Sequence, residues 1–334
     1  MQQLNKEKAW SFSVVFCAAV LIHILVEIFA SIIGSKYEIP IFMQLILSEM
    51  TIILPGLTWI VLNKASFRET LKFKPIKVST IFMSILLIEL LSPLVTLINL
   101  LSQLYEGNAV VDMSVSAIGE NKLLLLFIMG FFGPFVEEFV FRGIIANGMN
   151  RFSSALGAAV VSGLMFGLLH MNFNQFCYAF VLGIIFHIVN YASGSVYTSM
   201  VMHTVVNTQN VLLLFISEKF MSAMGSDIAS AASDARTSDM FYYMIGIYLI
   251  LAVIFTAVSL PVFSFIAKNE GNPDAFRHLK DKRVIDESVD DLDETATKKV
   301  PKSWWLNAYS IIGAVICLLM IFALEPILRA LGVM

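Results

Sequence analysis

A stretch of 66 residues without one Asp, Glu, Lys or Arg runs from Phe152 to Ser217. About a quarter of the residues of a soluble protein are charged, so such a run does not fit a hydrated surface. The whole chain is 58% apolar and 14% charged, with a mean hydropathy of +0.80. A net charge of −3 provides no basic surface for nucleic acid, and we expect no such partner. The composition predicts an integral membrane protein that has the lipid bilayer as a partner.

A helix needs about 20 apolar residues to cross the hydrocarbon of a bilayer. Lipid cannot satisfy free backbone groups, and no segment alternates like a barrel strand, so the spans must be helical. The sequence therefore predicts an all-α, polytopic membrane helix bundle with about nine transmembrane helices. The predicted spans are Trp10–Ile33, Ile39–Leu62, Val78–Ser102, Lys122–Ala146, Ser153–Met171, Asn174–Tyr191, Val196–Ser217, Met240–Ala267 and Trp304–Val333.

The basic residues predict the orientation of these spans. Sixteen Lys and Arg residues fall in segments on the same side as the N-terminus and five on the other side. Because cytoplasmic loops carry the excess of Lys and Arg, we expect the N-terminus in the cytoplasm and the C-terminus outside. A composition rich in Phe, Ile and Lys, with short loops, favours a bacterial cell membrane.

The strongest chemical signal is a charged cluster inside the fourth predicted span, where ionisable residues are costly and suggest function. Glu138 and Arg142 are four residues apart, in the favourable order for an ion pair on one helix face. Glu137 is rotated about 100° from Glu138, so it is the carboxylate less engaged by the arginine. It is the candidate general base. The alternative is a structural ion-pair cluster that holds helices together.

Two histidine motifs follow in the charge-free block. Phe166 precedes His170 by four residues, and His203 precedes Asn207 by four. Residues at this spacing project from one helix face, so His203 and Asn207 can donate to one point, as an oxyanion site requires. Each motif alone is weak, because a single helical histidine also serves as a hydrogen-bonding residue within a bundle.

Together the three motifs resemble the CAAX-protease and bacteriocin-processing (CPBP, or Abi) family. These are intramembrane glutamate proteases, and they include the type II CAAX prenyl endopeptidase. The resemblance is firm over residues 120–217, with an eight-helix core usual in the family and a ninth, C-terminal helix here. The motifs are intact at Glu137-Glu138…Arg142, Phe166…His170 and His203…Asn207.

The resemblance implies a role for each motif residue. Glu137 and His170 would activate a water that attacks a peptide carbonyl, and His203 with Asn207 would stabilise the oxyanion. No covalent intermediate, cofactor or metal is implied. The implied substrate is a peptide or protein at the membrane, of lipidated or bacteriocin type. The remaining motif residues would support the site, and these are Glu138, Arg142 and Phe166.

Other functional readings remain open. Glu137, His170 and His203 could serve as three zinc ligands, although the H-E-x-x-H motif of zinc proteases is absent. A non-catalytic immunity factor or scaffold could keep the same residues for structure. A transporter is disfavoured, because no internal repeat is evident.

The predicted organisation is a protease core over residues 1–267, a charged cytoplasmic loop over 268–303 and an extra transmembrane helix over 304–334. At about 1.5 Å per residue, Glu137 lies roughly 14 Å and His170 roughly 25 Å from the inner ends of their predicted helices. They can meet only if the helices tilt or the second helix begins later. Among the remaining intramembrane acids, we expect Glu89 rather than Glu49 to support the site.

Overall fold

The computed structural model describes residues 2–34, 36–108, 121–225, 236, 238–281 and 306–324. Every regular element within these ranges is a helix. In chain order the elements are α1 (Gln2–Gly34), α2 (Ile41–Leu62), α3 (Phe67–Leu71), α4 (Val78–Ser102), α6 (Lys122–Phe127), η1 (Ile128–Phe132), α7 (Gly133–Glu137), η2 (Glu138–Ala146), α8 (Asn147–Met149), α9 (Ala155–Leu169), α10 (Phe173–Ser193), α11 (Tyr197–Ala223), α13 (Asp239–Asn269), α14 (Ala308–Leu319) and η3 (Met320–Leu324), where η marks a π-helical segment.

Seven helical stretches are long and apolar enough to cross a membrane, which confirms the predicted polytopic helical membrane fold. They are Ser11–Gly34, Ile41–Leu62, Val78–Ser102, Lys122–Met149, Phe173–Ser193, Tyr197–Ala223 and Asp239–Asn269. The outer surface of α13 fits a lipid environment, because Ile247, Ile250 and Val253 are 54%, 63% and 66% exposed. Such a large apolar surface is rare on soluble monomers.

One of the nine predicted spans differs from expectation, and the last lies partly outside the described residues. The span predicted over Ser153–Met171 is the shorter helix α9, with 15 residues. Ser154 caps its first turn, and the chain turns at Met171, which has a φ of 50°. The last predicted span is described only as far as Leu324, as the short apolar helix Ala308–Ala323.

The fourth span also extends further than predicted. The helical stretch continues three residues past Ala146 to Met149, so Glu137 lies deeper from that end than expected. The longer helix reduces the predicted difference in depth between Glu137 and His170.

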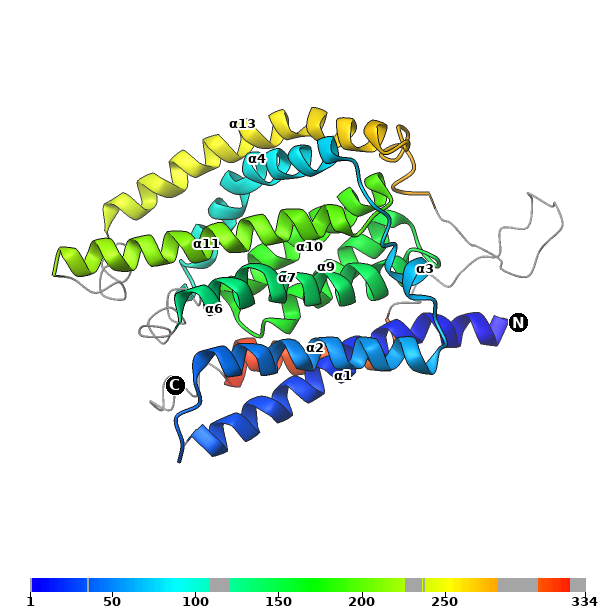
Figure 1. Cartoon of the computed structure of the whole chain (residues 1–334), viewed down its shortest axis with the longest axis horizontal. Coiled ribbons are helices and arrows are strands. Elements are labelled where there is room, and N and C mark those ends of the chain that lie inside the picture. The colour runs from blue at the N-terminus through cyan, green and yellow to red at the C-terminus, as the bar shows by residue number, and fades with distance from the viewer. Residues whose placement is uncertain are drawn as a thin grey trace.

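The bundle has two flanking groups of helices around a central one (Figure 1). Helices α1, α2 and α14 pack together along one side, and α4 and α13 pack against each other along the opposite side. Helices α9, α10 and α11 lie between them, with the α6–α8 stretch, and all three motifs belong to this central group. The three predicted motifs therefore fall in the interior of the bundle.

Most of the predicted charged loop, including its acidic run from Asp286 to Glu294, lies outside the described residues. The described part, up to Asp281, packs on the core. Glu270 accepts a hydrogen bond from the backbone N–H of Lys77 at 2.9 Å, and the Leu279 carbonyl accepts one from Leu156 at 2.9 Å. These contacts connect the start of the loop to the first turns of α4 and α9.

Helices α9 and α10 approach each other unusually closely through glycines. Gly163 and Gly167 form a small-xxx-small face on α9, the spacing that lets membrane helices approach backbone to backbone. A Cβ added to Gly183 of α10 would lie 2.7 Å from Gly163 Cα, and one added to Gly167 would lie 2.9 Å from the Phe176 carbonyl oxygen. The two helices therefore form a tightly packed hairpin.

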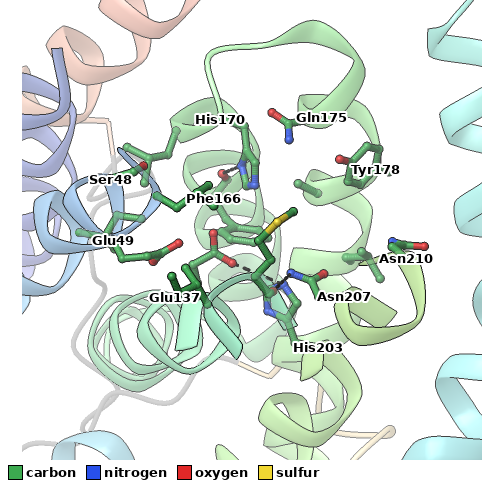
Figure 2. A pocket seen from close by; sticks show the side chains of 18 of the residues that line it. Ser48, Glu49, Glu137, Phe166, His170, Gln175, Tyr178, His203, Asn207 and Asn210 are labelled. Carbon is green, nitrogen blue, oxygen red and sulfur yellow. Dashed lines mark hydrogen bonds and ion pairs between the residues drawn. The ribbon is translucent and has the colours of Figure 1, made fainter. Parts of the chain in front are cut away.

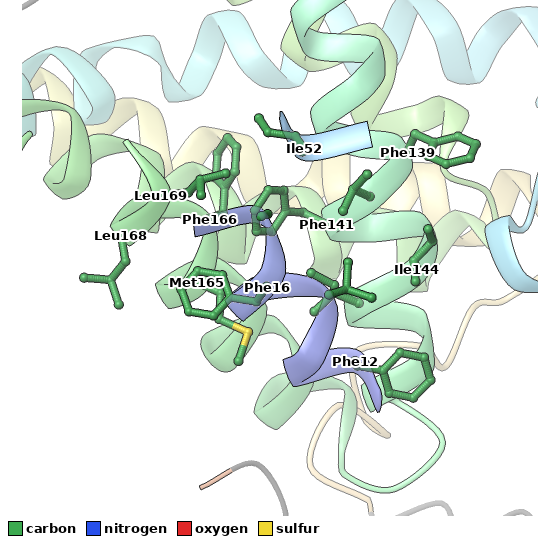
Figure 3. Packing of buried hydrophobic residues seen from close by; sticks show 14 of the residues in the cluster. Phe12, Phe16, Ile52, Phe139, Phe141, Ile144, Met165, Phe166, Leu168 and Leu169 are labelled. Carbon is green, nitrogen blue, oxygen red and sulfur yellow. The ribbon is translucent and has the colours of Figure 1, made fainter. Parts of the chain in front are cut away.

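An apolar core supports the hairpin from the other side (Figure 3). Phe12 and Phe16 of α1 and Phe141 of η2 are buried in one cluster with Met165 and Phe166 of α9. The Phe141 and Phe166 rings meet edge to face at 5.1 Å between centroids. Phe166, a motif residue, thus belongs to the core as well as to the site.

We predict that Gly183→Ala destabilises the protein, because its Cβ would force the α9 and α10 backbones apart. The expected loss in unfolding free energy is about 1–3 kcal/mol, typical of overpacking. The measurement is the unfolding midpoint in detergent micelles. Gly246→Ala on α13 is the control, because a Cβ there meets no atom within 4 Å. Equal midpoints for the two variants would contradict the close contact.

Candidate active site

A cavity of about 290 Å³ lies among α1, α2, η1, α7, α9, α10 and α11. Figure 2 shows its polar side chains pointing toward a common space. All four residues predicted to be catalytic line it, namely Glu137, His170, His203 and Asn207. The structure therefore brings together residues from α7, α9 and α11 that are up to 70 positions apart in the sequence.

Beside the cavity lies a buried ion pair. Arg142 Nη1 is 3.0 Å from Glu138 Oε1, as the i, i+4 spacing predicts, and the two side chains are 1% and 0% exposed. The guanidinium carbon lies 4.2 Å from the ring centroid of Phe166 on α9 and 5.3 Å from that of Phe186 on α10. Aromatic faces stabilise a desolvated cation, so Arg142 connects η2 to both helices of the hairpin.

The imidazole of His203 joins the two glutamates. Its Nδ1 is 3.0 Å from Glu138 Oε1, and its Nε2 is 3.4 Å from Glu137 Oε2. Because Glu138 accepts only, Nδ1 is the donor in the first contact, which fixes the ring orientation. Glu137 makes no ion pair with Arg142 among the described residues. The two adjacent carboxylates therefore have different surroundings, as their 100° rotation implies.

His170 lies at the end of α9, and its ring is held by a backbone carbonyl of that helix. Its Nδ1 is 2.9 Å from the carbonyl oxygen of Phe166. That carbonyl accepts, so Nδ1 is the donor and Nε2 is left with a lone pair. His170 makes no direct hydrogen bond to Glu137 in the described part of the chain, although both line the cavity.

Asn207 reaches the cavity while anchoring α11 to an irregular helix. Its Nδ2 donates to the carbonyl of Met129 at 3.2 Å, and the neighbouring Thr208 Oγ1 donates to the carbonyl of Gly130 at 3.3 Å. Residue 134 would pair with Gly130 in an α-helix or with Met129 in a π-helix, but Pro134 has no N–H. The proline thus leaves one of these carbonyls without its backbone donor, and α11 donates to both. One Asn207 N–H remains for a ligand.

The structure corrects the expectation about the remaining intramembrane acids. Glu89 on α4 accepts a hydrogen bond from Gln209 and does not line the cavity. Glu49 on α2 does line it, beside Glu137. Tyr178 of α10 is a further polar residue of the cavity wall that the sequence analysis missed. Its helix carries no motif residue, so no spacing in the sequence pointed to Tyr178.

The described residues contain no grouping of three His, Cys, Asp or Glu side chains with metal-binding geometry. Glu137 and His203 are adjacent, but His170 donates its Nδ1–H to a backbone carbonyl and stands apart from that pair. The three residues considered as zinc ligands therefore share a cavity without converging as a ligand set.

We predict that Arg142→Gln lowers the unfolding free energy by about 3–5 kcal/mol, because it leaves the buried Glu138 carboxylate without its cation. Unfolding in detergent micelles measures this loss. Arg277→Gln is a matched control, since Arg277 Nη1 is also 3.0 Å from its partner, Asp274 Oδ1, but the two side chains are 82% and 54% exposed. We expect the control to lose less than about 1 kcal/mol. If Arg142→Gln also loses less than about 1 kcal/mol, the buried ion pair contributes no more to stability than the exposed one.

Comparison with known proteins finds one family model that is similar to this region. Residues 119–209 match the family model described as Type II CAAX prenyl endopeptidase Rce1-like. The match contains all three motifs and α9, α10 and the first half of α11. Searches of curated proteins and of solved structures gave no match. This match is consistent with a CAAX protease of the CPBP family, which the three motifs resemble.

Proposed function

We propose that the chain is a metal-independent, glutamate-type intramembrane endopeptidase with Glu137 as its general base. The observation that carries the proposal is that Glu137, His170, His203 and Asn207 all line one cavity. A purely structural ion-pair cluster explains Glu138 and its arginine, but it gives no reason for a second glutamate beside a cavity. The family match supports the same activity.

In the first step, a water in the cavity loses a proton to the Glu137 carboxylate, and its oxygen forms a bond to the peptide carbonyl carbon. His170 orients the same water through Nε2, because its Nδ1–H is already donated to Phe166. A positioned base of this kind contributes about 10²–10⁴-fold to a rate. A water between the two residues also accounts for the absence of a direct hydrogen bond between them.

The carbonyl oxygen becomes negative as the water attacks, and it needs hydrogen-bond donors. In this proposal His203 is an imidazolium held between the two glutamates, so both of its ring nitrogens are donors. Its Nδ1–H binds Glu138, and its Nε2–H and the second N–H of Asn207 stabilise the oxyanion. When the carbon–nitrogen bond breaks, the proton held by Glu137 passes to the departing nitrogen. The products are a carboxylic acid and an amine, and no covalent enzyme intermediate forms.

The cavity walls support an apolar peptide as substrate. Besides its polar groups, the cavity is lined by Leu45, Ile52, Leu169, Leu182 and Val211. We infer a membrane-associated, lipidated or bacteriocin-type peptide, cleaved near the cytoplasmic face of a bacterial membrane with the N-terminus inside and the C-terminus outside. In this proposal residues 1–267 form the protease core, 268–303 the cytoplasmic loop and 304–334 an additional helix.

Replacement of Glu137 tests the mechanism directly. We expect Glu137→Gln to lower kcat by about 10²–10⁴-fold, because the amide cannot accept the proton of water. The assay is cleavage of a peptide library by detergent-purified protein, and Glu89→Gln on α4 is the control because Glu89 lies outside the cavity. Parallel reactions contain a metal chelator.

Each alternative function gives a different result in that assay. If the wild-type protein cleaves no peptide, and Glu137→Gln leaves the biological effect intact, the non-catalytic scaffold or immunity role is favoured. Inhibition by the chelator, reversed by zinc, would favour a zinc-dependent protease that uses the same residues.

Replacement of Asn207 tests the oxyanion role. Asn207→Leu removes a donor from the cavity, and we expect kcat to fall by about 10²–10³-fold with little change in KM. Thr208→Val is the matched control, since it also deprives an η1 carbonyl of its partner but lies outside the cavity. Equal kcat values for the two variants would assign Asn207 a structural role only.

A further inference from the structure

The cavity contains an acidic group that the proposed mechanism does not use. Glu49 is the single charged residue of α2. Its Oε2 is buried and has no hydrogen-bond partner within the described part of the chain. Its Oε1 lies 3.0 Å from the position that a Cβ on Gly133 would occupy. Gly133 thus leaves room for the Glu49 carboxyl group against α7.

Glu49 faces the candidate base. Gly133 and Glu137 are four residues apart on α7, so they lie on one face of the helix. Figure 2 shows the Glu49 and Glu137 carboxyl groups directed toward each other in the cavity.

The surrounding charges do not neutralise Glu49. The described titratable and charged groups that face this part of the cavity, or lie directly behind it, come from α1, α7, η2, α9, α10 and α11, and they are His23, Glu137, Glu138, Arg142, His170, Tyr178 and His203. The one arginine is paired with Glu138, and His203 contacts Glu137 and Glu138. No described basic side chain makes an ion pair with Glu49. Two carboxyl groups at close range in a weakly polar site cannot both be ionised, so such pairs share one proton.

We propose that Glu49 is a positioning residue of the peptidase site that holds the shared proton and donates a hydrogen bond to the Glu137 carboxylate. His203 contacts Glu137 on the side away from Glu49 and stabilises its negative charge. Glu49 then orients Glu137 toward the water. When Glu137 takes the proton of that water, the pair holds two protons, and one leaves with the amine product. This role rests on the proposed function.

The dependence of kcat/KM on pH separates this role from a structural one. For the wild type we expect activity to fall on the alkaline side as the pair loses its shared proton. Glu49→Gln keeps a donor that cannot ionise, so we expect it to fold, to remain active at neutral pH and to lack that alkaline fall. Glu49→Leu removes the donor and should lower kcat by about 10²-fold with KM little changed. Glu89→Gln should keep the wild-type profile, and a wild-type profile for Glu49→Gln would overturn the proposal.

A second measurement needs no activity. A hydrophobic carbodiimide adds to protonated carboxyl groups, and mass spectrometry of peptides locates the adduct. At neutral pH we expect an adduct on Glu49 or Glu137 in the wild type and in Glu89→Gln, and none on Glu137 in Glu49→Gln. If neither Glu49 nor Glu137 is labelled in the wild type, or if Glu137 is labelled in Glu49→Gln, the proposal that the two residues share a proton is wrong. If labelling follows expectation but no peptide is cleaved, the proposed function fails and the proton-sharing pair stands.

Discussion

The buried guanidinium of Arg142 is the interaction on which the rest of the site depends. A cation in this interior is tolerated only where an anion and polarisable surfaces surround it. Glu138 supplies the charge, and the Phe166 and Phe186 rings supply the surfaces, so η2 is connected to α9 and α10. Because Glu138 also accepts from His203, the same charge orients the side chain on α11. Arg142 is therefore linked, directly or through Glu138, to every helix that contributes a motif.

A second constraint comes from the backbone of the fourth span. In a membrane interior each carbonyl without a partner costs several kcal/mol, so a proline inside a span must be compensated from elsewhere. Pro134 withholds the one N–H that could reach either the Met129 or the Gly130 carbonyl, and side chains of α11 donate to both. Asn207 thereby has two functions, since it fastens α11 to η1 and presents its second N–H to the cavity. The irregularity in η1 is what brings this amide to the site.

Sequence reasoning succeeded where local spacing determines the outcome. The i, i+4 rule predicted the ion pair of Glu138, and hydrophobic length predicted seven full spans. It failed where neighbouring helices decide. Spans that are apolar on every side have no periodicity to show which face turns inward, so Glu89 was preferred to Glu49. The early end of α9 was also missed, because its turn places Met171, rather than a glycine, at positive φ. The link from His203 to both glutamates depends on inter-helix geometry that no motif encodes.

The glycine contacts between α9 and α10 have a mechanical consequence. Where backbones touch, no side chain can change its rotamer to absorb a displacement, so the two helices move as one stiff body. His170 is attached to that body at the end of α9. On the opposite side, α1 and α2 meet the centre through side chains such as Phe12, Phe16 and Ile52, and several of their outer residues are exposed. Widening the cavity for a peptide must therefore displace the α1–α2 wall, while the α9–α10 hairpin keeps its position.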